Sequence, residues 1–125
     1  MAVIQKLLIS IVALIHFVFM WVEMFRWEER GPGVFPDFPP EFFSLTNAMA
    51  ANQGLYNGFI AVGVIWSLIK SQREISLLFL CFVVVAGIYG GMTVDMKIFY
   101  LQSIPAVLAL VSMRAGPSVS NSAER

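Results

Sequence analysis

The chain has 125 residues, of which 58% are hydrophobic and 13% are charged, and eight basic residues balance eight acidic ones. Soluble domains carry about 25% charged residues, so this composition predicts a surface that contacts lipid. The lack of net positive charge excludes the basic surface that nucleic-acid binding needs. One cysteine and one histidine are too few for a zinc site, and the sequence indicates no metal and no cofactor.

Four segments are apolar and close to the length of a transmembrane helix. A bilayer core of about 30 Å takes about 20 mostly apolar residues as helix, so we expect helices at residues 3–27, 46–69, 75–94 and 98–113. The fourth contains Pro105, which should kink it. The predicted fold class is therefore all-α, a four-helix transmembrane bundle over residues 1–114. We expect residues 115–125 to be a disordered polar tail.

The connection between the first two segments is long, and the others are short. It contains Gly31-Pro32-Gly33 and a second proline-rich stretch at residues 35–40, where we expect no regular helix. Basic residues are enriched on the cytoplasmic side of membrane proteins. If both termini lie in the cytoplasm, five basic residues are inside and three are outside, so we expect this orientation. The inner ones are Lys6, Lys70, Arg73, Arg114 and Arg125, and the outer ones are Arg26, Arg30 and Lys97.

Polar side chains within the spans gather toward the outer side. His16 and Glu23 lie two helical turns apart on one face, about 10 Å along the axis. The other polar residues fall in the outer halves of their segments, whereas the inner halves are almost wholly apolar. Because polar groups in lipid need partners or water, we predict one polar pocket. It is lined by His16, Met20, Glu23, Trp27, Asn52, Gln53, Tyr56, Asn57, Tyr89 and Gln102.

Structural roles remain open for several of these residues. Glu23 could extend outward and pair with Arg26, and the amide side chains could serve only as interhelical contacts. Small residues also recur at helical spacing, which lets neighbouring helices approach closely. These packing positions, which are also the candidate surface for a homo-oligomer, are Gly54, Gly58, Gly87 and Gly91.

Short runs in all four segments resemble one known family. They are His16 with Glu23-Met24, the run Ala-Ala-Asn-Gln-Gly-Leu-Tyr-Asn-Gly at 50–58, Val-Ala-Gly-Ile-Tyr-Gly at 85–90 and Gln-Ser-Ile-Pro-Ala at 102–106. Through them the chain resembles, over nearly all of residues 3–113, the small membrane proteins catalogued as domain of unknown function 1304. The resemblance implies a four-helix integral membrane protein, chiefly bacterial, and hence a multi-pass protein of the inner membrane. It implies no activity.

Three functions compete for this sequence. The first is binding or transport of a small, partly polar molecule in the outer pocket, where Trp27 and Tyr56 would suit the lining. The second is an intramembrane enzyme in which His16 and Glu23 perform acid–base chemistry on a lipid-like substrate, although no nucleophile motif accompanies them. The third is an accessory subunit that docks a larger membrane partner through its glycine faces. We favour the first and leave open whether the chain is an enzyme.

Overall fold

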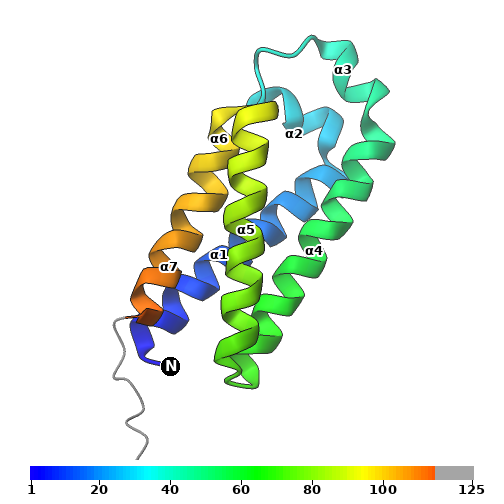
Figure 1. Cartoon of the computed structure of the whole chain (residues 1–125). Helices are drawn as coiled ribbons and strands as arrows, with labels where there is room; N and C mark the ends of the chain where they lie inside the picture. The colour runs from blue at the N-terminus through cyan, green and yellow to red at the C-terminus, as the bar shows by residue number, and fades with distance from the viewer. Residues whose placement is uncertain (115–125) are drawn as a thin grey trace, which may run out of the picture.

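The computed structural model describes residues 1–114, which are mostly helical and contain no β-strand. This confirms the all-α prediction, and the expected tail at 115–125 lies outside the described residues. The helices are α1 (Val3–Phe25), α2 (Trp27–Val34), α3 (Pro40–Leu45), α4 (Asn47–Ile69), α5 (Arg73–Thr93), α6 (Met96–Ile98), the π-helix η1 (Phe99–Ser103) and α7 (Ile104–Arg114). The last three elements follow each other directly and form one rod (Figure 1).

Four long rods lie side by side and alternate in direction: α1, α4, α5 and the α6–η1–α7 rod (Figure 1). Each rod contacts the next, and α7 also contacts α1, so the contacts form a ring. The helices α2 and α3 and the start of α6 lie at one end, here called the loop end. The N-terminus, the α4–α5 turn and Arg114 lie at the other end, here called the terminal end.

Three rods in the described part of the chain are long and apolar enough to cross a membrane, namely Val3–Phe25, Arg73–Thr93 and Met96–Arg114. The helix α4 has a similar length, but its first half contains Asn52, Gln53 and Asn57, which lower its mean hydropathy. On all four rods large apolar side chains point outward. Leu14, Phe59, Phe82 and Leu108, one from each rod, are more than half exposed. Such surfaces are compatible with contact to a lipid bilayer.

The apolar core occupies the terminal half of the ring. Its buried members are Ile9, Val12, Ala13, Val64, Leu80, Val83, Ala106, Ala109 and Met113. Helices in lipid associate mainly through van der Waals contact and interhelical hydrogen bonds, and the terminal end contains both. Gln5 Nε2 donates to Ser112 O at 2.9 Å, and Arg73 Nη2 donates to Met113 O at 2.7 Å. These two bonds satisfy carbonyls that the last turn of α7 would otherwise leave free.

The turn between α4 and α5 is closed by hydrogen bonds around a strained residue. Ser71 has a φ of 53°, in the left-handed region that costs a residue with a side chain roughly 1–2 kcal/mol. Gln72 N–H donates to Ser67 O at 2.9 Å, the bond that marks a Schellman motif at a helix end. The hydroxyls of Ser67 and Ser76 lie 2.7 Å apart and link the two helices directly.

Glycines let the rods of one chain approach each other. A Cβ at Gly54 of α4 would lie 2.7 Å from Met24 Cγ of α1, and a Cβ at Gly91 of α5 would lie 2.7 Å from Phe99 Cβ of η1. Side chains of the same chain cover the predicted glycine faces in this way, at Gly54, Gly58, Gly87 and Gly91. These four glycines therefore pack against side chains of the same chain, and a homo-oligomer or partner surface at them stays a prediction.

Part of the long connection is helical, contrary to the prediction. A break at Arg26 ends α1, and α2 then runs through Gly31-Pro32-Gly33. The ring of Phe43 from α3 covers Gly31, where a Cβ would lie 2.5 Å from Phe43 Cδ1. This contact favours the helix and offsets the hydrogen bond that Pro32 cannot donate. The helix α3 begins at Pro40, a position where the missing N–H costs nothing.

A π-helical turn precedes Pro105. The N–H of Ile104 donates to Phe99 O, five residues back, rather than four as in an α-helix. Pro105 has no N–H to continue the α-helical pattern, and the widened turn accommodates this loss. The Ser103 hydroxyl donates to Val84 O of α5 at 2.9 Å and ties the turn to its neighbour. The distortion expected at Pro105 thus takes the form of a π turn.

Candidate functional site

The most enclosed polar contact of the loop half joins α1 to α4. Asn57 Nδ2 donates to Glu23 Oε2 at 2.7 Å. Asn57 is only 6% exposed, and Glu23 is half-buried. Gly54 lies one turn from Asn57 on the same face of α4, and its hydrogen sits against Glu23 Cβ and Met24 Cγ. The close approach of the two backbones at this glycine is what brings the carboxyl and the amide within hydrogen-bonding distance.

Glu23 pairs with this amide and not with the nearby arginine. Arg26 Nη1 lies 2.7 Å from Glu29 Oε2, and Arg30 Nε lies 3.5 Å from the other oxygen of Glu29. The i, i+3 pair of Glu23 with Arg26 that the sequence allowed does not form. A carboxyl within the span therefore has a neutral partner in the described residues.

His16 lies deeper in the same buried stripe of α1. Its ring is 2% exposed, and Nδ1 is 2.8 Å from Val12 O in the preceding turn. A carbonyl oxygen can only accept, so Nδ1 carries a proton, and in the neutral ring Nε2 is an acceptor. Within residues 1–114 no hydrogen bond connects His16 to Glu23 or Asn57. His16 and Glu23 thus share a face of α1 without a direct hydrogen bond between them.

One atom on each of two buried residues, His16 and Asn57, has unused hydrogen-bonding capacity. Within the described residues, His16 bonds only through Nδ1 and Asn57 only through Nδ2. Their other polar atoms, His16 Nε2 and Asn57 Oδ1, make no hydrogen bond there. Every fully enclosed side-chain nitrogen or oxygen in that part of the chain has a partner. It follows that His16 Nε2 and Asn57 Oδ1 are each open to contact from outside the protein.

Other residues of the predicted pocket lie apart from this pair. Asn52, Gln53 and Tyr56 are exposed, Tyr89 is 71% exposed and Gln102 is half-buried. None of these five side chains makes a hydrogen bond within residues 1–114. The structure therefore brings Glu23 and Asn57 together and leaves these five outside the contact.

The arrangement of α4 and α5 explains why these side chains stay exposed. At about 100° per residue, Asn52 and Tyr56 share a face of α4 with Gly63, and Gly63 is covered by the ring of Phe79 on α5. That contact lies in the terminal half. Toward the loop end the two helices diverge (Figure 1), so the same face of α4 is left uncovered at Asn52 and Tyr56.

Trp27 and Met20 also have packing roles. Because α1 breaks at Arg26, Trp27 leaves the line of His16 and Glu23, and its Nε1 donates to Thr46 Oγ1 at 3.0 Å. The indole ring then packs in an aromatic cluster at the loop end with Phe35, Phe38, Phe42 and Phe43. Met20 lies over Gly58, where a Cβ would be 2.7 Å from its Sδ.

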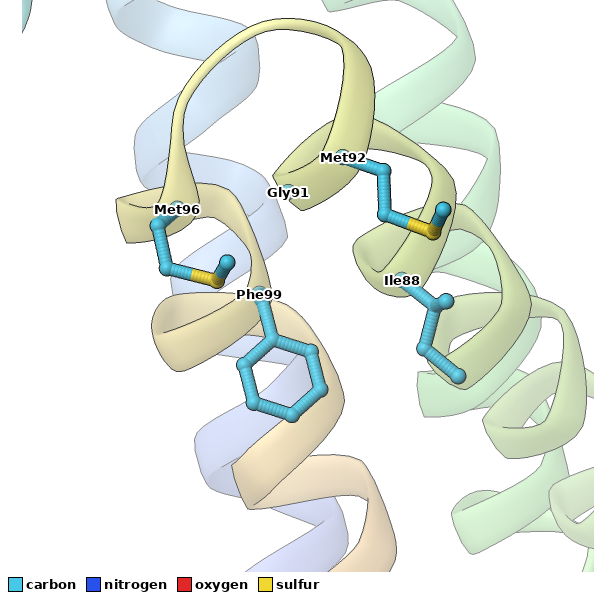
Figure 2. Close-up of a pocket in the computed structure, with 5 residues that line it drawn as sticks. All are labelled: Ile88, Gly91, Met92, Met96 and Phe99. Carbon is cyan, nitrogen blue, oxygen red and sulfur yellow. The ribbon is translucent and has the colours of Figure 1, made fainter.

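Two surface pockets within residues 1–114 lie at helix ends, and the sequence analysis did not predict either of them. One, of about 220 Å³, lies between the end of α5 and the start of the last rod, and Figure 2 shows Met92 and Met96 on its two sides. The other, of about 200 Å³, lies at the α1–α2 break and includes Trp27. The five residues of the first are Ile88, Gly91, Met92, Met96 and Phe99. The second pocket depends on the break at Arg26, which hydropathy does not locate.

The fold defines a multi-pass helical membrane protein, since three rods meet the length and composition of spans. The chain belongs to the family described as "Protein of unknown function (DUF1304)", whose model matches residues 10–114. This confirms the resemblance seen in the sequence. The uncharacterized protein YpaA of Lactococcus lactis subsp. lactis (strain IL1403) is 32% identical over 116 residues, which is 90% of this chain and 98% of the relative. No solved structure gives a significant match.

Proposed function

We propose that this chain is a four-helix transmembrane bundle that binds a small, partly polar molecule in its outer half. Both termini lie in the cytoplasm, so the loop end faces outward, and the membrane is the inner membrane of a bacterium. The hydrogen bond between Glu23 and Asn57 carries the proposal. Polar and ionisable groups inside a membrane are costly, and those that persist commonly mark a binding site or a pathway.

The distribution of polar and apolar groups supports binding more than passage through the membrane. The loop half holds the Glu23–Asn57 contact and the open acceptor of Asn57, and Asn52 and Tyr56 are exposed on a different face of α4 in the same half. The terminal half is closed by the apolar core. A molecule that entered the outer half would meet polar partners there and a tightly packed floor below.

The test is ligand-dependent stabilisation of the full-length protein in detergent. A panel of small metabolites, together with hexylammonium, hexanol and hexanoate, is added to the protein, and the melting temperature is recorded. A ligand at 100 times its Kd stabilises the folded state by about 2.7 kcal/mol, so we expect at least one compound to raise the melting temperature by several degrees.

Asn57→Leu provides the specific test and Asn47→Leu the matched control. Both changes replace an amide by an apolar side chain on α4, but Asn47 is exposed at the start of the helix and bonds to Glu28 instead. We expect Asn57→Leu to lose the shift and Asn47→Leu to keep it. A panel without any stabilising compound, or a shift that Asn57→Leu retains in full, would be evidence against the proposal.

A further inference from the structure

The hydrogen-bonding groups left open near Glu23 are acceptors, apart from the second amide hydrogen of Asn57. Asn57 uses one amide hydrogen on Glu23 Oε2, and its Oδ1 is open. The carboxyl of Glu23 has a second oxygen, and each carboxylate oxygen can accept more than one hydrogen bond. Two turns deeper, the Nδ1 of His16 is taken by Val12 O and the open Nε2 accepts. A molecule that satisfies this group of atoms must bring donors.

The charge around Glu23 points in the same direction. The basic side chains of the loop end have other partners: Arg26 and Arg30 lie on Glu29, and the ammonium of Lys97 donates to Val34 O at 2.9 Å. No ion pair to Glu23 occurs within residues 1–114. A carboxylate inside a membrane is strongly disfavoured without a compensating cation, and the described residues do not supply one here.

We infer that the ligand of this site is a small amphipathic cation, with a primary ammonium group on an apolar body. This inference rests on the proposed function and adds the class of ligand. The ammonium offers three donors and one positive charge, which match the carboxylate of Glu23 and the Oδ1 of Asn57. The apolar body would lie against the lipid-facing surface beside Met20 and Met24, whose flexible side chains adapt to varied shapes.

The experiment compares three hexyl compounds that differ only in their polar group. Hexylammonium carries a charge and donors, hexanol carries a neutral hydroxyl, and hexanoate carries the opposite charge. Apparent Kd values are obtained from the concentration dependence of the melting temperature of the full-length protein. We expect hexylammonium to bind at least tenfold more tightly than hexanol, and hexanoate to give no shift.

Two variants locate the selectivity. Glu23→Gln keeps an oxygen that can accept from Asn57, so the α1–α4 contact is retained while the charge is lost. We expect it to weaken hexylammonium binding at least tenfold. The matched control is Glu74→Gln, which neutralises an exposed carboxylate at the terminal end and should leave the Kd unchanged. The wild-type preference among the three compounds stands as a test even if Glu23→Gln does not fold.

The outcomes separate this inference from the function on which it rests. Hexylammonium that binds no better than hexanol, or equally well to Glu23→Gln, overturns the inference. If hexanol or hexanoate binds instead, in a manner that Asn57→Leu abolishes, the binding function stands and the ligand class is wrong. If no compound of any class binds, both fall.

Discussion

Gly54→Ala tests the close approach of α1 and α4 most directly. The added methyl would lie 2.7 Å from Met24 Cγ, 2.9 Å from Glu23 Cβ and 3.1 Å from the carbonyl oxygen of Met20, against 3.4–4 Å for ordinary van der Waals contact. One of these atoms belongs to the backbone and another is a Cβ. Neither can turn aside, so the two helices must separate, and the 2.7 Å hydrogen bond of Asn57 to Glu23 must lengthen.

Two opposing terms set the size of the effect. Overpacking a well-filled contact costs about 1–3 kcal/mol, whereas replacing glycine by alanine within a helix gains about 1 kcal/mol. We therefore expect Gly54→Ala to destabilise the folded state by up to about 2 kcal/mol. At Gly58 the obstructing atom is the Sδ of Met20, the far end of a flexible side chain, so Gly58→Ala should be close to neutral. At Gly33 no atom lies within 4 Å, and Gly33→Ala should stabilise.

The assay is reversible unfolding of each variant in mixed micelles, by titration with a denaturing detergent and detection by circular dichroism. The three substitutions are chemically identical, so differences among them report the surroundings of each glycine. The expected order of stability is Gly33→Ala, then Gly58→Ala, then Gly54→Ala. If Gly54→Ala proved as stable as Gly33→Ala, the close contact between α1 and α4 would not exist as described.

Two further predictions concern the α4–α5 turn and the orientation. Ser71→Gly should stabilise the protein by up to about 1 kcal/mol, because glycine removes the strain of the left-handed backbone at a φ of 53°; an unchanged unfolding midpoint would argue against that conformation. In a Cys81→Ser background, Asp37→Cys should react with an impermeant maleimide on intact cells, and Gln72→Cys only after permeabilisation. The reverse pattern would mean that the termini lie outside.

Hydropathy is sufficient to predict long apolar helices, because membrane spans leave few alternatives for the backbone. The same reasoning could not place the break at Arg26 or the helix through Gly31-Pro32-Gly33. The helix through the glycines depends on the ring of Phe43, which reaches Gly31 from another helix. Once α1 ends at the break, Trp27 packs in the aromatic cluster, a tertiary contact that no local sequence pattern records.

The sequence contains a signal for Asn57 as the partner of Glu23, although the prediction did not pair the two residues. Asn57 follows Gly54 by three residues and adjoins Gly58, so it belongs to the face that the small residues turn toward α1. Asn52 and Tyr56 lie on a different face. The depth of the polar residues of α4 does not separate the face toward α1 from the exposed face. The glycine spacing separates these two faces.

The two ends of the helix ring differ in the hydrogen bonds that join neighbouring rods. At the terminal end, side chains from α1, α4 and α5 bind across the rods, beneath a filled apolar core. At the loop end α4 and α5 spread apart (Figure 1), and within residues 1–114 the hydrogen bond of Lys97 to Val34 O is the one that joins α2 to the last rod. The protein is accordingly stiff at one end and compliant at the other. A separation of α4 from α5 at the loop end would leave the apolar core of the terminal half undisturbed.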